Sequence, residues 1–385
     1  MNMARALIGG FGYTRVGDHW NKSLVDLILD AASRASNVYK GPKIDQIIVS
    51  NMFSELSSSQ LNLGTIIAEG LLSDGVGALR VEGADCSGGL AVELATSMVK
   101  SGARDAVLVA GGEKIRDLAP GYAPLAISLG ESAEFTQFIG CTLPALYGML
   151  TRLYMNKYDI SRESLSAFPV LAHANAASVE HAMFRKKISH EDVARSALVS
   201  DPIRLLDSAS LGDGAAAVII VRDDLLKERK GAVEIVGSSV ATGTNNFYSR
   251  GDMLDFTSTG AATKDVMKKS GVSLDKIDFV EIHDSFSIAA ALSLEAMGIS
   301  KRGLATNDAM NGVFDTKGRM PINSFGGLKA RGNPIGATGI YQIIEAYLQL
   351  CNKAGANQLR GVRTGLVHSM AGVDSVAAVH VLRRT

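Results

Sequence analysis

The sequence predicts a layered α/β fold built from two similar halves, on three observations. Apolar stretches with helix and strand periodicities alternate along much of the 385-residue chain. A helix, a polar turn and a buried strand recur with related sequences, KIDQIIVSNM at 43–52 and KIDFVEIHDS at 276–285. Between these, residues 118–202 interrupt the alternation. Alternating helices and strands favour layers around a largely parallel sheet, and the repeated segment indicates a duplication in which each half supplies one sheet.

The first half is predicted to run strand, helix, strand, helix, strand. The N-terminal stretch MNMARALIGGFGYTRVGD suits a first strand and turn, because glycines interrupt its short apolar run. Helical spacing of apolar residues marks two helices, one through Leu24, Leu27, Ile28 and Ala31 and one through Leu90, Leu94 and Met98. The apolar runs that follow them, at 45–49 and 105–110, predict buried strands.

The second half repeats this order. Residues 262–271 suit a helix and 277–282 the strand after it. A later helical stripe consists of Ile340, Ile343, Ile344, Tyr347 and Leu348. Two further apolar runs, at 365–368 and 376–382, predict the last strands.

Residues 118–202 are predicted to leave the first half as a loop domain that covers a site. This stretch contains helical segments at 143–157 and 162–181 and a polar stretch at 185–192. Residues 207–221 then return to a glycine turn and a buried strand. We therefore expect residues 1–117 with 203–230 to form the N-terminal half, 118–202 the loop domain, and 231–385 the C-terminal half.

Composition excludes several classes of protein. The 39 basic and 39 acidic residues cancel, so no overall charge favours nucleic acid or an anionic membrane as a partner. Cys86, Cys141 and Cys351 show no CxxC spacing, so neither a disulfide framework nor a metal site is indicated, and a reducing cytoplasm fits best. No apolar run approaches the roughly 20 residues that a membrane span needs.

The segment GADCSGG contains the main candidate nucleophile, Cys86. We expect Cys86 at the junction of a strand and a helix, where unpaired backbone N–H groups and the helix dipole favour the thiolate. The glycines after it would let another backbone or a substrate approach closely. The alternative interpretation is a small cysteine buried in the core.

Two further segments contain residue types suited to chemistry. VEIHDSF places His283, Asp284 and Ser285 at the end of an apolar strand, where α/β proteins bind ligands. A histidine there can donate to a carbonyl oxygen or move a proton near neutral pH, although by itself it equally suits a structural role. NSFGGLKARGNPIGATG, at 323–339, is rich in glycine but lacks the GxxxxGK[ST] order of a phosphate loop.

Together these segments resemble the thiolase superfamily, and within it the archaeal acetoacetyl-CoA thiolases (acetyl-CoA C-acetyltransferases) and the sterol-carrier-type thiolases. The matching motifs are the Cys86 turn, GGEK (111–114), SLGDGAAAV (210–218), HDSF (283–286), GGLKARGNPIGATG (326–339) and LVHSMAG (366–372). They span essentially the whole chain. The resemblance implies the thiolase fold, a duplicated five-layered α-β-α-β-α architecture with mixed sheets and an inserted loop domain.

The resemblance also implies acyl transfer between coenzyme A thioesters, with no bound cofactor and no metal. In thiolases a cysteine takes the acyl group from one acyl-CoA and passes it to the α-carbon of a second; the reverse reaction cleaves a 3-oxoacyl-CoA with coenzyme A. By resemblance Cys86 is the nucleophile and His283 helps to bind the thioester oxygen of the second substrate. The backbone N–H groups of Cys86 and Ala371 would form an oxyanion hole, although the family usually has glycine at Ala371.

Three positions depart from the family in residues that handle protons. Asn333 replaces the histidine of the family's GHP motif, and an amide cannot accept a proton at neutral pH. Ser285 stands where close relatives often have cysteine, and Ser369 stands where other thiolases have the cysteine of CxGG. A general base typically contributes a factor of roughly 10²–10⁴, so its loss would slow turnover without preventing acyl-CoA binding.

Two hypotheses therefore stay open. In the first, His283 or His368 serves as base and the chain is an acetyl-CoA acetyltransferase or 3-oxoacyl-CoA thiolase, as the intact Cys86 turn favours. In the second, it is a non-condensing acyl or lipid carrier or a scaffold subunit of a larger acyl-transfer complex, as Asn333, Ser285 and Ser369 favour.

The expected partners also follow from the resemblance. Thiolases pair their first-half sheets across a two-fold axis, so we expect a homodimer or homotetramer. Archaeal relatives associate with HMG-CoA synthase through an OB-fold, zinc-ribbon protein, and both are candidate partners here.

The remaining candidates suit structural or surface roles: His19, His173, His181, His190, His380, Cys141, Cys351 and the charged run 185–187.

Overall fold

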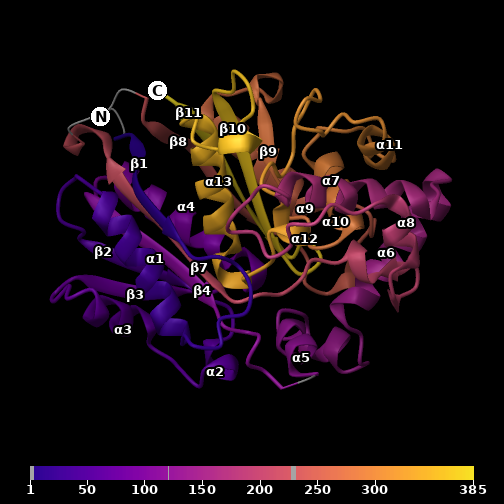
Figure 1. Ribbon diagram of the computed structural model, residues 1–385, viewed down its shortest axis with the longest axis horizontal. Coiled ribbons are helices and arrows are strands. Elements are labelled where there is room, and N and C mark those ends of the chain that lie inside the picture. Colours follow the sequence, from indigo (N-terminus) through magenta and orange to yellow (C-terminus); the bar gives the residue numbers. More distant parts are fainter. Residues whose placement is uncertain (1–3, 120, 227–230) are drawn as a thin grey trace.

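Nine strands form one continuous sheet in the order β3-β2-β4-β7-β1-β8-β11-β10-β9 (Figure 1). This is a computed structural model that describes residues 4–119, 121–226 and 231–385, so residues 1–3 and 227–230 of the predicted halves lie outside it. The first half supplies β1 (Ala6–Tyr13), β2 (Gln46–Ser50), β3 (Gly77–Val81), β4 (Ala106–Glu113) and β7 (Gly214–Arg222). The second half supplies β8 (Val233–Thr242), β9 (Phe279–Glu281), β10 (Thr364–Ala371) and β11 (Val376–Arg384).

The two half-sheets meet between β1 and β8. Leu7 lies opposite Glu234, the one residue pair in register between these two antiparallel strands. By contrast, β1 pairs with β7 along most of its length. Each half thus contributes its own set of strands, and a short seam joins the two sets.

The sheet is mixed, so the expectation of a largely parallel sheet is wrong, whereas the mixed sheets implied by the resemblance are confirmed. β2 runs parallel to β3 and β4, and β9 runs parallel to β10. The other pairs are antiparallel. β11 must oppose β10, because only a turn at 372–375 separates them.

The hydrophobic clusters show five layers, with helices on both faces of each half-sheet. Alternate residues of β4 point to opposite faces: Leu108 packs with α1 (Leu24–Val38) and α3 (Leu63–Gly70), and Val109 packs with α4 (Ser87–Lys100) and α13 (Thr338–Leu350). β10 alternates likewise, with Val367 facing α13 and Leu366 facing α9 (Thr257–Ser270) and α10 (Ser287–Ala296). The helices α4 and α13 are therefore the central layer, between the two half-sheets (Figure 1).

Most predicted elements are present, with ends shifted by a few residues. The predicted helix at 162–181 is shorter: a 3₁₀ turn, Arg162–Ser166, precedes α7 (Ala167–Ala176). Pro169 lies in the first turn of α7, where its missing N–H breaks no helical bond. The strand expected before Cys86 is β3, whereas β8 and the short hairpin of β5 (Leu198–Ser200) and β6 (Ile203–Arg204) were not predicted.

The interruption at 118–202 contains α5 (Tyr122–Ser128), α6 (Leu143–Tyr158), α7 and α8 (His190–Arg195). This segment interrupts the first half of the chain, but its helix α6 packs on the second half. Leu146, Leu150 and Tyr154 of α6 share one hydrophobic core with α9 and α10. The short helices α2 (Ser54–Ser57), α11 (Ala305–Met310) and α12 (Gly327–Ala330) complete the fold. No helix within the described ranges is long and apolar enough to cross a membrane.

Candidate functional site

Cys86 lies at the N-terminus of α4, as predicted. Ala84–Cys86 form a 3₁₀ turn in which Ala84 adopts a left-handed φ of 48°, and α4 begins at Ser87. The thiol is 0% exposed, and its Sγ donates to the backbone oxygen of Ser369 at 3.4 Å. Burial raises the pKa of the Cys86 thiol far above its usual range, and the charge of Asp85 raises it further. Burial therefore outweighs the helix N-terminus, and the resting thiol is protonated.

The two predicted oxyanion donors are brought together. Ala371 is the last residue of β10 and belongs to the same small apolar cluster as Cys86. The backbone N–H of Cys86 donates to the carbonyl of Gly83 at 3.0 Å, which closes the turn. An oxyanion at this position would share that N–H.

Glycines allow the nucleophile turn to lie this close to the second half. A Cβ added to Gly88 would lie 3.0 Å from the backbone nitrogen of Gly339, and one added to Gly339 would lie 2.5 Å from that of Gly89. The starts of α4 and α13 therefore cross backbone to backbone. The predicted close approach of another backbone is present here.

Asn333 lies beside this turn and is held on both ends of its amide. Its Nδ2 donates to Oδ1 of Asp85 at 3.1 Å, and its Oδ1 accepts from Oγ1 of Thr338 at 2.5 Å. The side chain is 3% exposed. These partners define the orientation of the amide, and neither of its polar atoms is a base.

The two predicted histidines also lie together: His283 follows the end of β9, and His368 lies within β10. Burial lowers the pKa of His283 well below its usual range, and the nearby His368 and Arg331 lower it further. Burial likewise lowers the pKa of His368 to about 3. Both imidazoles are therefore neutral at neutral pH.

His283 and His368 differ in the hydrogen bonds that their ring nitrogens make. Nε2 of His368 bonds with the Thr259 hydroxyl at 2.9 Å, and its Nδ1 accepts from the backbone N–H of His283 at 3.4 Å. Both ring nitrogens of His368 are thus occupied. Nδ1 of His283 is buried without a partner among the described residues. Of these two histidines, His283 is therefore the one with unused hydrogen-bonding capacity.

Comparison with known proteins explains this combination of features. Residues 2–224 match the family model "Thiolase, N-terminal domain", and residues 239–384 match "Thiolase C-terminal domain-like". The chain belongs to the thiolase family. Its class as a thiolase-type acyltransferase, expected from the motifs, is confirmed.

Full-length relatives and structures agree with the assignment. An acetyl-CoA acetyltransferase of Methanothermobacter thermautotrophicus is 35% identical, over 97% of this chain and 98% of the relative. One of Methanocaldococcus jannaschii is 33% identical, over 99% of each. Among solved structures, an "Ltp2-ChsH2(DUF35) aldolase" shares the fold with a TM-score of 0.85 at 21% identity, over 100% of this chain and 98% of the other.

Ser285 and Ser369 of this thiolase stand at positions where the family uses cysteines, and both make structural contacts. The Ser369 hydroxyl donates to Oε1 of Gln342 at 2.9 Å. The backbone oxygen of Ser285 accepts from the N–H of Ala209 at 2.7 Å, and its side chain hydrogen-bonds with the phenol of Tyr147.

Sequence reasoning missed three residues around this thiolase site. Tyr147 stacks on Phe286 with ring centroids 4.4 Å apart, and its hydroxyl donates to the carbonyl of Gly372 at 2.6 Å. Asp85 and Glu131 are buried carboxyl groups, each 5% exposed. A charged residue in the apolar GADCSGG turn was a visible signal for Asp85. Tyr147 and Glu131 had none, because both lie in the excursion, far in sequence from every motif.

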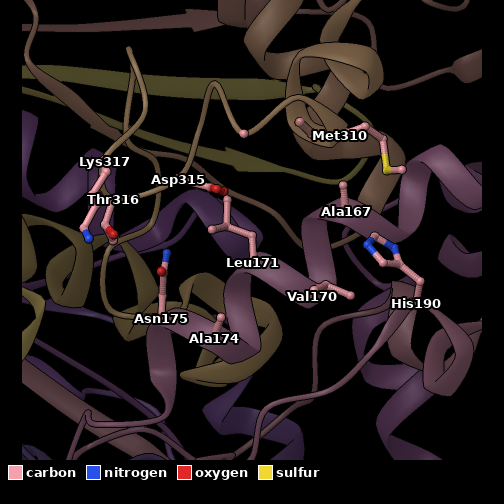
Figure 2. A pocket seen from close by; sticks show the side chains of 12 residues that line it. Ala167, Val170, Leu171, Ala174, Asn175, His190, Met310, Asp315, Thr316 and Lys317 are labelled. Carbon is pink, nitrogen blue, oxygen red and sulfur yellow. The ribbon is translucent and has the colours of Figure 1, made fainter.

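A separate pocket has a volume of about 420 Å³, and Figure 2 shows the side chains that line it. Side chains of α7, His190 at the start of α8 and residues 309–317 line it, and none of its lining residues surrounds Cys86. His190 is held at one side by the Ser166 hydroxyl, 2.6 Å from its Nδ1. Across residues 4–119, 121–226 and 231–385, no group of three or more His, Cys, Asp or Glu is placed to hold a metal ion.

Proposed function

We propose that this thiolase is an acetyl-CoA acetyltransferase or 3-oxoacyl-CoA thiolase that carries its acyl group on Cys86. The main support is the position of Cys86, at the start of α4 and against the end of β10, in a chain related over its full length to acetyl-CoA acetyltransferases. Coenzyme A thioesters are its substrates, and the related fold of a thiolase "in complex with coenzyme A" from Ascaris suum agrees with this.

In this proposal each predicted site residue has a role that its contacts allow. The backbone N–H groups of Cys86 and Ala371 hold the oxyanion of the acylation step. Neutral His283 binds the thioester oxygen of the second substrate as a hydrogen-bond donor. His368, with both nitrogens bonded, orients His283, and Ser285 hydrogen-bonds with Tyr147 at the wall of the site.

Asn333 takes a different part from that of the family's histidine. Because Asp85 and Thr338 hold its amide, Asn333 can present its second Nδ2 hydrogen to a substrate oxygen. It therefore stabilises negative charge but does not move a proton.

We further propose the division into halves at 1–117 with 203–230 and at 231–385, with 118–202 as the loop domain over the acyl-CoA site.

Exposed apolar residues on this loop domain, including Leu125, Leu129 and Phe138, would face a partner. The candidate partners are a second copy of the chain, HMG-CoA synthase and an OB-fold, zinc-ribbon protein. A structural neighbour is called "Ltp2-ChsH2(DUF35) aldolase", which names two components. We place the enzyme in the cytoplasm, on the three unpaired cysteines.

The second candidate function, an acyl carrier that does not condense, is favoured by Asn333, which occupies the position of the family's base. The two functions differ in the step after acylation. A carrier would become acylated and release the group unchanged to water or coenzyme A, whereas a thiolase would also cleave acetoacetyl-CoA with coenzyme A.

The test is acylation of Cys86. After incubation with acetyl-CoA, intact-protein mass spectrometry should show one acetyl adduct, and the Cys86→Ala variant should lack it. Digestion should place the adduct on Cys86. An adduct on Cys141 or Cys351 instead would show that the nucleophile is misassigned. A thiolysis assay with acetoacetyl-CoA, alone and with the candidate partners, then separates the enzyme from the carrier.

A further inference from the structure

The residues at the family's proton-handling positions cannot move protons in this chain. The amide of Asn333 is not a base, and the Ser369 hydroxyl donates to Gln342. His368 has both ring nitrogens bonded. Yet the buried thiol of Cys86 has a raised pKa, so its activation requires a proton acceptor.

Asp85 is the candidate for that acceptor. It directly precedes Cys86 in the 3₁₀ turn, is 5% exposed, and has its Oδ1 held by Asn333 Nδ2 at 3.1 Å. Asn333, which stands at the position of the family's base, therefore donates a hydrogen bond to the Asp85 carboxyl group, next to Cys86 in the chain. Asn333 orients Asp85, and the carboxylate supplies the basic atoms that the amide lacks.

Glu131 approaches the same turn from the loop domain. A Cβ on Gly130 would lie 3.2 Å from the Cβ of Ala84, so this segment packs directly on the nucleophile turn. A Cβ on Gly372 would lie 2.6 Å from Oε1 of Glu131, so the carboxyl group lies against the backbone next to Ala371. Glu131 thus lies between the nucleophile turn and the residue after the second oxyanion donor.

We propose that Asp85 accepts the thiol proton of Cys86 and that Glu131 takes the α-proton of the second acyl-CoA. This assignment rests on the acyl-CoA reaction proposed above. It deepens that reaction by giving two carboxyl groups the roles that a histidine and a cysteine have in the family.

The first step balances with Asp85 alone. The Asp85 carboxylate takes the proton from Sγ as the sulfur attacks the thioester carbonyl carbon. The new bond from Cys86 to the acyl carbon forms, and the bond from that carbon to the coenzyme A sulfur breaks. The departing thiolate takes the proton from Asp85, which leaves free coenzyme A and restores the carboxylate.

The second step balances with Glu131. Its carboxylate removes a proton from the α-carbon of the second acyl-CoA, and the carbanion attacks the acyl carbon on Cys86. A carbon–carbon bond forms, and the bond from that carbon to Sγ breaks. The Cys86 thiolate then takes the proton from Glu131, which returns both groups to their starting states.

The charges around the two groups suit these roles. Burial raises the pKa of Asp85 to about 6, and the hydrogen bond from Asn333 opposes the rise. Burial raises the pKa of Glu131 to about 7; Arg250 lowers it and the charge of Asp85 raises it. The other titratable groups near the pair are the thiols of Cys86 and Cys141 and the phenol of Tyr147, and Asp374 faces Cys86 and Tyr147. Both carboxyl groups can therefore exchange protons near neutral pH.

The experiment on Asp85 measures how fast Cys86 becomes acetylated. Asp85→Asn keeps an oxygen for the Asn333 hydrogen bond but removes the base, so acetylation by acetyl-CoA should slow by roughly 100-fold or more. In the wild type the rate should rise with pH through about 6 and then level off. In the variant it should continue to rise into alkaline solution, because the thiol must ionise unaided. Asp85→Glu, which keeps a carboxyl group, should retain more activity than Asp85→Asn.

The experiment on Glu131 separates the two steps. Glu131→Gln should acetylate Cys86 within about three-fold of the wild type, but should exchange the α-protons of acetyl-CoA with deuterated water roughly 100-fold more slowly. Glu131→Asp should exchange faster than Glu131→Gln. The matched controls are Glu134→Gln and Asp74→Asn, two exposed carboxylates, and both should behave as the wild type.

Circular dichroism and thermal unfolding would show which variants are folded. Where Asp85→Asn or Glu131→Gln does not fold, the conservative variants Asp85→Glu and Glu131→Asp decide the question. Wild-type acetylation rates in folded Asp85→Asn would overturn the role of Asp85. Wild-type exchange in Glu131→Gln, or no exchange in the wild type itself, would overturn the role of Glu131. If the wild type never acetylates Cys86, the proposed function itself fails.

Discussion

At the scale of single residues, the nucleophile shows two opposing effects. The helix N-terminus contributes a partial positive charge, whose stabilisation of an anion is typically about 0.3–1 kcal/mol. Complete burial destabilises the thiolate by more than the helix N-terminus stabilises it, and the pKa of Cys86 is therefore raised. A buried, protonated thiol resists unwanted reaction at rest and depends on a neighbouring base when substrate is bound.

Asn333 allows a test between an impaired thiolase and a rebuilt site. Asn333→His should not raise the acetylation rate of Cys86, because the larger imidazole would break the bonds to Asp85 and Thr338 in a site only 3% exposed. In the Asp85→Asn background, the same change should raise that rate by about ten-fold, since the imidazole then supplies the missing acceptor. Rates are measured by intact-protein mass spectrometry.

The opposite result would favour the impaired-thiolase hypothesis. If Asn333→His alone raised the rate by ten-fold or more, Asp85 would not be serving as base. Thr338→Val is a matched control, because it removes the second partner of Asn333 without adding a base. It should lower the rate modestly in either background.

At the scale of elements, the crossing of α4 and α13 brings the two halves of the site together. α4 carries Cys86 at its start, and α13 follows the loop that carries Asn333. Neither helix could approach the other as closely with a side chain at Gly88 or Gly339. The glycine-rich segment is thus a packing feature between two helix starts, and no phosphate ligand is needed to explain it.

Gly339→Ala should therefore destabilise the protein and displace the nucleophile turn. The added methyl group would lie 2.5 Å from the backbone nitrogen of Gly89, and backbone can yield only by shifting a helix. We expect a loss of unfolding free energy on the order of 1–3 kcal/mol, measured by urea denaturation. Gly251→Ala is the control, because a Cβ there meets no atom within 4 Å. Equal midpoints for the two variants would contradict the crossing.

At the scale of the whole molecule, buried carboxyl groups should make stability depend on pH. Burial raises the pKa of Asp85 to about 6 and those of Glu113 and Glu131 to about 7, above the roughly 4 of unfolded chains. The folded state thus binds these protons more tightly. The stability that these groups contribute is complete below about pH 4 and is lost as pH rises through about 6 to 7.

Glu131→Gln isolates one of these contributions. Between pH 5 and pH 8 the wild type should lose more unfolding free energy than this variant does, measured by urea denaturation at several pH values. Carboxyl groups with a lowered pKa, such as Asp26 and Asp252, act in the opposite direction and only in more acid solution. Glu134→Gln should follow the wild type. Parallel curves for wild type and Glu131→Gln would show that burial does not shift Glu131.

We also predict that the molecule is at least a dimer. β3 is an edge strand of the nine-stranded sheet, and its residues Gly77–Val81 are only partly buried within one chain. An open edge of this kind invites pairing with a second copy. Light scattering at micromolar concentration should report at least twice the mass of one chain, and the mass of a single chain would contradict the prediction.

The predictions from sequence succeeded where the signal was local. The Cys86 turn, the helix after it and the strand that ends near His283 depend on spacing within a few residues, so periodicity indicated them. The strand directions were wrong, because a parallel or antiparallel pairing depends on where distant segments meet. Nothing near Glu131 in the sequence indicated that its carboxyl group lies beside Gly372.

The sequence by itself determined the alternating elements, the duplication, the family and the candidate nucleophile, because each of these depends on residue types at short spacing or on ordered motifs. Only the tertiary structure decided which groups surround that nucleophile. Asp85 and Asn333 are 248 positions apart, and their bond exists because α4 and the segment before α13 cross at glycines. Burial, the largest cause of the pKa shifts of Asp85, Cys86 and Glu131, likewise arises only when segments far apart in the sequence pack together.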